Sequence, residues 1–434
     1  MNREVTSDVS VVRCTDYGRD VTMLAIRRAV DMLGGMKKFV KSGDRVLIKP
    51  NLLKAASPDS AVTTHPEVVR AVIRLVRECG GRPMVGDSPG MGDLKKVAEK
   101  AGILEVLIEE GAELTELVDA VEVKNIGRFQ RFEVSRVAYE ADVIINLPKL
   151  KTHGMTTLTG AIKNLFGCIP GKRKVQWHFN TGVNHGLFMR MLVELYALLD
   201  PRLTIMDAVI GMEGNGPGSG DPRWIGAVLA SEDGVALDIV AGKMVGVPPE
   251  KLPIIKAAAA AGIGAANLDR IRIRGDALEE VAVSQYRLSP PTHLEWQIPE
   301  WARGYLKNAF TAKPVINHSQ CIQCGICQKH CPQKAIQSRG KNLQIRYRDC
   351  IRCFCCQEFC PQGAITVCRG WMLALLPRQR ANRGRRKKTG EKNDKKNDKK
   401  TEKCISYTRK EASTLLLCQC PRWYPYNHYL NVGR

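Results

Sequence analysis

Two matching cysteine runs contain the residues of this sequence that are best suited to metal chemistry. Each run has the spacing C-x2-C-x2-C-x3-C-P, which is typical of bacterial-type iron–sulfur proteins. In such pairs of runs the fourth cysteine of one run binds the cluster of the other run. The spacing therefore predicts two 4Fe–4S clusters. One would be held by Cys321, Cys324, Cys327 and Cys360, and the other by Cys350, Cys353, Cys356 and Cys331.

Two other uses of these cysteines are four-cysteine zinc sites and disulfides. Zinc ribbons use pairs of C-x2-C rather than triples, and here the cysteine–proline ending occurs twice, so the iron–sulfur interpretation is favoured. Cys355 lies outside the spacing and is expected to be a small buried side chain. Half of the 16 cysteines fall in the two runs. Thiolates reserved for iron indicate a reducing compartment, and we expect the cytoplasm.

Polar residues follow four short apolar stretches that we interpret as strands, at 45–49, 83–86, 142–146 and 203–207. Open parallel sheets bind ligands at the carboxyl ends of their strands, so these polar side chains are expected to converge. Several are lysines, which favours an anion such as a carboxylate or a phosphate; the alternative for each lysine alone is a solvated surface position. The predicted substrate-binding residues are Lys49, Asn51, Asp87, Ser88, Lys149, Lys151, Lys163 and Asn164.

Three further residues are candidates for catalysis. His153 and His185 have side chains that could act as general acids or bases, or could simply be satisfied polar groups. Asp207 follows the fourth apolar stretch and could orient a base, bind a cation or cap a turn.

A glycine-rich stretch at 211–220 gives only a weak cofactor signal. Its glycines alternate at Gly214, Gly216, Gly218 and Gly220, which is not the G-x-G-x-x-G spacing of dinucleotide sites. The phosphate-binding G-x-x-x-x-G-K-[ST] run does not occur in the sequence. The sequence therefore contains no nucleotide-binding motif, and a dinucleotide site is disfavoured.

The elements that must position these residues alternate between apolar stretches and helical patterns through residues 1–275. This alternation predicts an α/β core with three layers and a mainly parallel sheet. Helices are expected at 64–79, with a threonine cap, and at 93–110, 185–199, 231–245 and 250–261. Residues 276–318 are expected to form a connector, and 319–368 a small α+β ferredoxin-like domain. The basic, low-complexity segment 369–434 is expected to be disordered.

The net charge of +22 suggests nucleic-acid binding at first sight, but its location weakens that interpretation. Residues 370–434 hold 17 Lys and Arg against 5 Asp and Glu, so more than half of the net charge belongs to the tail. Aromatic side chains are not interleaved with its basic run, so nucleic-acid binding is not expected. The N-terminus has no apolar signal-peptide core, and no apolar run reaches the roughly 20 residues of a membrane span.

Several phrases in this order resemble the family known as domain of unknown function 362. They include Ile48-Lys-Pro-Asn51, Gly86-Asp-Ser-Pro89, Asn146-Leu-Pro-Lys-Leu-Lys-Thr-His153 and Ala161-Ile-Lys-Asn164. The resemblance covers roughly residues 40–365 and implies an iron–sulfur protein with a two-cluster ferredoxin module. It implies no settled activity.

The sequence thus favours an iron–sulfur redox protein that relays electrons to an anionic small-molecule substrate at the strand ends. The alternative is a non-enzymatic electron carrier or assembly subunit whose α/β domain docks a partner protein. In both cases an electron-donor or electron-acceptor protein is expected as a partner.

Overall fold

The computed structural model describes residues 7–171, 173–181, 184–289, 312–340 and 342–368. Described residues up to 289 and from 312 to 367 belong to one compact unit, which includes both the α/β core and the cysteine-rich segment. In the described ranges, no helix has the length and apolarity needed to cross a lipid bilayer. The predicted tail at 369–434 lies outside the described residues.

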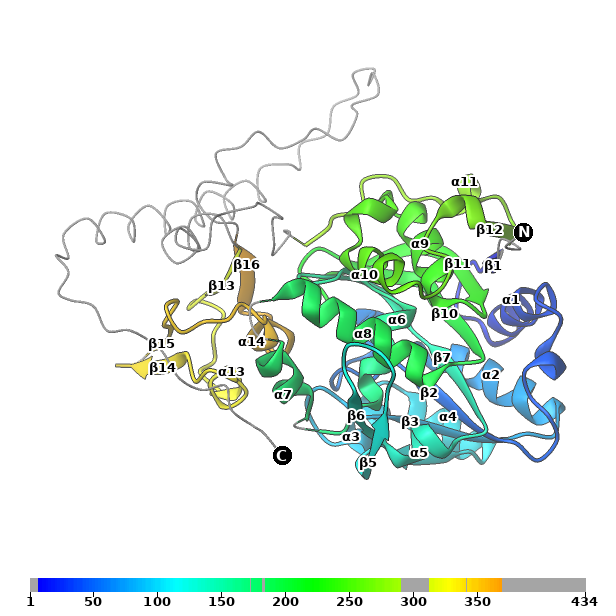
Figure 1. The fold of residues 1–434 in the computed structure, drawn as a ribbon, viewed down its shortest axis with the longest axis horizontal. Coiled ribbons are helices and arrows are strands. Elements are labelled where there is room, and N and C mark those ends of the chain that lie inside the picture. The colour runs from blue at the N-terminus through cyan, green and yellow to red at the C-terminus, as the bar shows by residue number, and fades with distance from the viewer. Residues whose placement is uncertain (1–6, 172, 182–183, 290–311, 341, 369–434) are drawn as a thin grey trace, which may run out of the picture. The chain divides into compact units, whose positions relative to one another are not determined.

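One large sheet forms the centre of the core, and ten strands contribute to it in the described part of the chain (Figure 1). Its main path has the order β12-β1-β11-β10-β7-β2-β3-β4, with β8 paired to β10 and β9 paired to β8. Most neighbours run parallel, whereas β11 runs antiparallel to β1 and β10. The strands are β1 (Ser7–Arg13), β2 (Arg45–Pro50), β3 (Arg82–Asp87), β4 (Glu113–Glu116), β7 (Val143–Leu147), β8 (Lys149–His153), β9 (Thr157–Thr159), β10 (Leu203–Glu213), β11 (Asp221–Ser231) and β12 (Ile271–Gly275).

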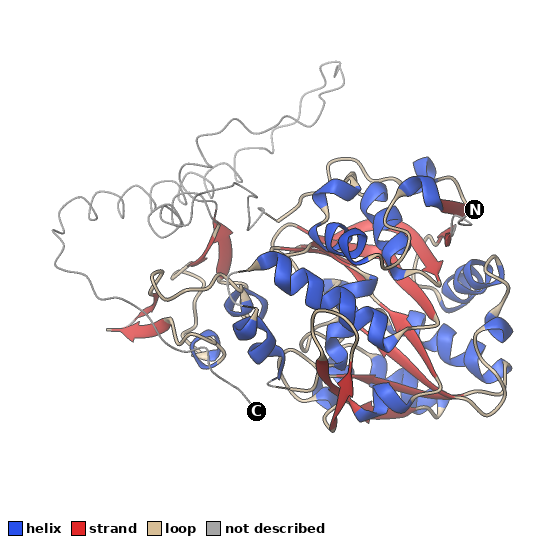
Figure 2. Ribbon diagram, viewed as in Figure 1, coloured by secondary structure: helices blue, strands red, loops and turns tan. Residues whose placement is uncertain are grey.

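Helices cover both faces of this sheet (Figure 2). Alternate residues of β2 point to opposite faces: Val46 and Ile48 pack in one hydrophobic core, and Leu47 packs in the other. The first core includes α1 (Arg19–Asp31), α2 (Pro66–Glu78), α3 (Leu94–Lys100) and α4 (Ile103–Glu110). The second includes α6 (Ala161–Asn164), α8 (His185–Leu199), α9 (Gly234–Met244) and α10 (Pro253–Ala261). The predicted three-layer α/β core with a mainly parallel sheet is therefore confirmed.

Several details differ from the predictions. The single helix expected at 93–110 is wrong, because Gly102 with φ 69° separates α3 from α4. The cap of α2 is His65, whose side chain accepts from the Glu67 amide, and not a threonine. Strand β10 continues to Glu213 and pairs with β11, so the expected loop at 211–220 is shorter than predicted. The first strand and helix, β1 and α1, were not predicted.

The smaller elements of the core are the β5–β6 hairpin and three short helices. They are β5 (Ala120–Lys124), β6 (Arg131–Ser135), α5 (Arg136–Glu140), α7 (Arg173–Asn180) and α11 (Leu278–Val281). Helix α11 lies in the predicted connector, whose residues 290–311 are outside the described ranges. Tyr286 of the same segment is buried, and its hydroxyl donates to the Met212 carbonyl at 2.6 Å. The start of the connector therefore packs on the core.

The cysteine-rich segment forms small α+β elements. They are β13 (Lys313–Ile316), α13 (Ile326–Lys329), β14 (Ile336–Arg339), β15 (Asn342–Ile345), α14 (Cys355–Glu358) and β16 (Ile365–Cys368). Strand β13 pairs with β16, and β14 pairs with β15. Because β13 begins at Lys313, it adds residues that precede the expected domain start at 319. We call residues 313–368 the cysteine module.

Candidate functional site

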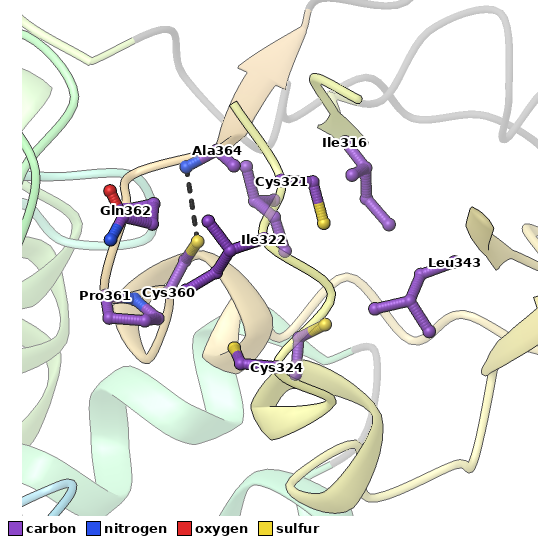
Figure 3. Close-up of a pocket in the computed structure, with 11 residues that line it drawn as sticks. Ile316, Cys321, Ile322, Cys324, Leu343, Cys360, Pro361, Gln362 and Ala364 are labelled. Atoms are coloured by element: carbon purple, nitrogen blue, oxygen red, sulfur yellow. Dashed lines mark hydrogen bonds between the residues drawn. The ribbon is translucent and has the colours of Figure 1, made fainter. Parts of the chain in front are cut away.

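The cysteines of the module surround two cavities. Cys321, Cys324, Cys327 and Cys360 line the first, together with Ile316, Leu343 and other apolar residues. Figure 3 shows the side chains of Cys321, Cys324 and Cys360 around this space. The remaining four cysteines of the runs, Cys331, Cys350, Cys353 and Cys356, line the second cavity. The structure therefore brings the eight cysteines together in the two sets that the spacing predicts.

The surroundings of the thiols fit iron–sulfur clusters. The Ala335 amide donates to Cys331 Sγ at 3.2 Å, and the Ala364 amide donates to Cys360 Sγ at the same distance (Figure 3). Amide hydrogen bonds to ligand sulfurs are one of the ways in which proteins tune such clusters. The empty spaces measure about 340 and 350 Å³, including parts open to solvent. Among the described residues, no three His, Cys, Asp or Glu side chains are grouped around a point suited to a single metal ion.

The two cysteine runs also repeat each other in backbone conformation. Residues with left-handed backbone conformation occur at corresponding positions of the two runs. The two members of each pair are as far apart in the sequence as Cys321 and Cys350 are. The corresponding pairs are Gln323 and Arg352, Gly325 and Phe354, and Lys334 and Gly363. The first and second runs are thus two copies of one local structure.

At the carboxyl ends of β2 and β3, Lys49 and Asp87 form a buried ion pair, with Nζ 2.8 Å from Oδ1. The Leu52 amide donates to the other Asp87 oxygen at 2.7 Å. Asn164 of α6 joins this group, since its Oδ1 accepts from Asn51 Nδ2 at 2.9 Å and lies 3.4 Å from Lys49 Nζ. The predicted residues Lys49, Asn51, Asp87 and Asn164 therefore lie together.

Lys149 and Asp207 lie in a second group within the sheet. Their side chains are fully buried, and Lys149 Nζ is 2.8 Å from Asp207 Oδ2. The Tyr17 hydroxyl donates to the other Asp207 oxygen at 2.7 Å, and the His65 amide donates to Oδ2 at 2.9 Å. Burial acts to raise the pKa of Asp207, but Lys149 and these hydrogen bonds lower it overall, so the carboxylate is ionised. This arrangement joins β8 and β10 to the segments that precede α1 and α2.

Lys151 is buried between the two groups without a carboxylate at hydrogen-bond distance among the described residues. Its Nζ donates to Asn51 Oδ1 at 2.6 Å and to the Val62 carbonyl at 2.8 Å. Burial and the positive charges of Lys163 and Lys149 lower the pKa of Lys151 well below its usual range. Its ammonium is therefore poorly stabilised.

His153 is buried and contacts the cysteine module. Its Nδ1 accepts from the Met155 amide at 2.9 Å, and its Nε2 lies 2.8 Å from Glu358 Oε1. Burial and the Lys163 ammonium lower the pKa of His153 to about 4, although Glu358 acts in the opposite direction. The ring is thus neutral near pH 7, and its proton is on Nε2 because Nδ1 accepts a hydrogen bond. His185 lies at the start of α8, where its Nε2 is 2.6 Å from the Met155 carbonyl.

A cavity of about 540 Å³, including space open to solvent, lies where the strand ends meet the cysteine module. We call it the strand-end cavity. Of the predicted substrate-binding residues, Lys49, Asn51, Asp87, Ser88, Lys163 and Asn164 line it. In the described part of the chain, Lys149, Lys151, His153, His185 and Asp207 are not among the lining residues.

The cavity lining also includes His178, together with Lys174, Glu358 and Phe359, which the sequence did not single out as site residues. Burial lowers the pKa of Lys174 to about 8, partly offset by Asp87. His178 is buried with its Nδ1 unpartnered among the described residues, and burial lowers its pKa to about 4. Burial acts to raise the pKa of Glu358, but Lys163 and His153 hold it well below its usual range. In the sequence, the feature that could have indicated a role for Glu358 and Phe359 is their position between two cysteines of the second run.

The glycine-rich stretch after β10 contacts the second cysteine run. Gln357 Nε2 donates to Asn215 Oδ1 at 2.7 Å and to the Gly216 carbonyl at 2.9 Å. A Cβ atom at Gly218 would lie 3.2 Å from the Glu358 carbonyl, so the two backbones approach closely. Lys54 adds a hydrogen bond of 3.1 Å to the Cys360 carbonyl. The glycines therefore allow the module to approach the core.

Comparisons with protein-family models agree with this architecture. Residues 46–243 match the model of the domain of unknown function DUF362, and residues 313–361 match a 4Fe–4S dicluster domain. Thylakoid-associated protein sll1697 of Synechocystis sp. is 39% identical over 299 residues, which cover 68% of this chain and 89% of that protein. A lactate racemase apoprotein from Thermoanaerobacterium thermosaccharolyticum aligns with a TM-score of 0.36 and 11% identity. This alignment covers 54% of this chain and 56% of the racemase.

Proposed function

Because the chain belongs to the DUF362 family and contains a 4Fe–4S dicluster domain, we propose that it is an iron–sulfur redox protein with two clusters. In this proposal the clusters relay electrons to an anionic small molecule bound in the strand-end cavity. The observation that carries it is the composition of the cavity lining. Strand-end residues of the core and Glu358 and Phe359 of the second cysteine run line the same space.

Support for two clusters comes from the separation of the eight cysteines into two cavities, each with three thiols from one run and one from the other. When bound, clusters of this kind supply electrons one at a time. Phe359 lies directly before Cys360 and lines the strand-end cavity. An electron leaving the set that includes Cys360 would therefore have a short covalent path to the cavity.

The charges in the cavity lining favour an anion of low charge. Lys49 is paired with Asp87, so the unbalanced charges are the cations Lys163 and Lys174 and the anion Glu358. This leaves one net positive charge, which suits one carboxylate better than a multiply charged phosphate. The unpartnered Nδ1 of buried His178 can donate a hydrogen bond to a carboxylate oxygen when it carries the ring proton, which would fix the orientation of the ligand.

In this scheme the other predicted residues act at a distance from the ligand. His153 positions Glu358 through its contact of 2.8 Å. The Lys149–Asp207 pair stabilises the sheet beside the cavity. Roles of His153, His185 and Asp207 in proton transfer stay predictions.

Anaerobic purification followed by measurement of iron, sulfide and released small molecules tests the proposal. We expect about eight irons per chain. We also expect small carboxylates to raise the thermal unfolding temperature of the holo-protein and to reoxidise the reduced clusters in at least one case. Lys174→Met should abolish the stabilisation by the carboxylate, whereas Lys243→Met on α9 should not. Eight irons without any carboxylate effect would instead support the non-enzymatic carrier function.

Two further elements of the proposal concern location and organisation. The relative from Synechocystis is described as thylakoid-associated, whereas the cysteine usage of this chain favours the cytoplasm. Fractionation of the native cells into membrane and cytoplasm tests this directly.

We also propose that residues 1–275 act as the catalytic core and the cysteine module as its electron relay.

A further inference from the structure

We propose that the first cysteine run and the exposed cations of the module form a docking surface for an acidic one-electron carrier protein. This inference rests on the two-cluster assignment of the proposed function. We call the exposed cations of the module the basic face. They are Lys329, Lys334, Arg339, Arg346 and Arg348.

Basic residues outnumber acidic residues in the cysteine module. Between residues 312 and 368 the sequence has eight Lys and Arg residues but only two acidic ones, Asp349 and Glu358. Asp349 lies 3.0 Å from Arg346 and 3.4 Å from Arg348, which balances part of their charge. Glu358 is buried in contact with His153 of the core. Apart from the ligand cysteines, the charged side chains that the module presents to solvent are therefore mostly basic.

Two of the cations lie on the elements that hold the first cysteine set. Lys329 ends α13, the helix that contains Cys327. Arg339 ends β14 and pairs with Asn342, the neighbour of Leu343, which lines the first cysteine cavity. A partner attracted by Lys329 and Arg339 would therefore approach the cluster site itself.

The loop between the first cysteines provides an apolar contact within this basic region. Ile322 is 60% exposed, and Cys324 is exposed as well. Redox complexes have small interfaces that form and separate quickly, and complementary charge guides the encounter. An exposed isoleucine beside a ligand cysteine, with cations nearby, suits such a short-lived complex.

A protein is favoured over an anionic membrane because of the exposed ligand. A lipid headgroup can balance the cations, but it neither donates nor accepts an electron at Cys324. In the proposed step the carrier loses one electron and the cluster of the first set gains it. No covalent bond or proton changes.

Stopped-flow reduction of the anaerobic holo-protein by a reduced acidic flavodoxin tests the proposal. We expect the rate constant to fall steeply with ionic strength, since charge steering is worth tenfold or more at low salt. The triple reversal Lys329→Glu, Arg339→Glu, Arg346→Glu should slow reduction at least tenfold and remove most of the salt dependence. Lys243→Glu on α9 of the core is the matched control and should change neither.

Dithionite reduction of the same samples gives the number of reducible clusters, and it separates two kinds of failure. If iron and sulfide analysis of these samples finds no cluster, both the two-cluster assignment and the docking proposal are overturned. Full reduction by dithionite, combined with a flavodoxin rate that neither salt nor the triple reversal changes, would overturn docking alone. Docking is equally overturned if the triple reversal abolishes sedimentation with phosphatidylglycerol vesicles but leaves the flavodoxin rate unchanged.

Discussion

The two cysteine runs have the same ligand spacing and the same backbone conformation, but they differ in their surroundings. In the first run Cys324 and Ile322 are exposed, whereas in the second Cys355, Cys356 and Cys360 are buried. Lys329 and Glu358 occupy equivalent positions two residues after the third cysteine. Lys329 is exposed to solvent, whereas Glu358 is buried against His153. Residues between the ligands therefore decide which run faces the core and which faces outward.

The largest effect is expected from ligand substitutions. Cys331→Ser should remove the same cluster as Cys350→Ser, although the two residues lie in different runs, because both line the second cavity. Each variant should lose about four irons per chain. Iron analysis and electron paramagnetic resonance of the reduced proteins provide the measurement. If Cys331→Ser instead matches Cys327→Ser, each run binds its own cluster.

The next largest effect is expected from charge reversal at Lys329 and Glu358. The two substitutions should differ in how much they change stability. Glu358→Lys places a buried cation beside Lys163 with no carboxylate to balance it, and an uncompensated buried charge costs about 4 kcal/mol of unfolding free energy. Lys329→Glu is exposed and should change stability by less than about 0.5 kcal/mol. Denaturant unfolding of both variants measures the difference. Equal losses would show that the second run does not depend on the core contact.

The histidines that face the second run predict a pH dependence of stability. His153 and His178 have pKa values lowered to about 4, against roughly 6.5 in the unfolded chain. The unfolded state therefore binds more protons between these values, so stability falls as the pH drops from about 6.5 to 4. Each histidine contributes about 3 kcal/mol to this fall.

Unfolding of the holo-protein at a series of pH values checks this prediction. His178→Phe should remove about half of the fall, because phenylalanine can stack on Phe188 without titrating. His318→Phe, in the exposed loop before the first run, is the control and should leave the profile unchanged. A profile unaffected by His178→Phe would mean that this ring is protonated in the folded protein as well.

Substituting alanine for the equivalent glutamines Gln357 and Gln328 is a milder test of how the two runs differ in their contact with the core. Gln357 donates to Asn215 and Gly216 of the core, so Gln357→Ala should cost about 1 kcal/mol. Gln328, its counterpart in the first run, should tolerate the same change with little loss. Thermal unfolding of the two variants is sufficient to compare them, and a larger loss for Gln328→Ala would contradict the assignment of the outward run.

The smallest effect concerns the left-handed position shared by Lys334 and Gly363. Lys334→Gly should leave stability unchanged or raise it by about 0.5 kcal/mol, because glycine adopts φ 49° without strain. Gly363→Lys should destabilise the protein, since its Cβ would lie 2.9 Å from Ser219 Cβ. Calorimetry on the pair compares a solvent-facing turn with one that packs on the core. Equal tolerance at both positions would contradict this packing.

Local patterns predicted much of the fold and the two cysteine sets. The apolar stretches at 45–49 and 142–146 have buried strand sequences, and the cysteine spacing is specific enough to divide eight thiols between two cavities. The strand-end cavity was predicted only in part. Lys149 and Lys151 lie on β8, where their ammonium groups bond inside the core, and no alternating apolar pattern marks that strand. The position of Glu358 depends on His153, a partner distant in sequence, so local patterns could not reveal it.

The crossed arrangement of the cysteines also has a consequence for biosynthesis. Cys360 lies near the end of the second run, yet it completes the cavity of the first. A nascent chain that has exposed only Cys321, Cys324 and Cys327 offers three of the four thiols that line this cavity. If each cavity binds a cluster as proposed, the second set of thiols is complete only after Cys356 has been synthesised, and the first only after Cys360. Both sets therefore become complete within the last few residues of the second run, and we expect cluster loading to follow the synthesis of that run.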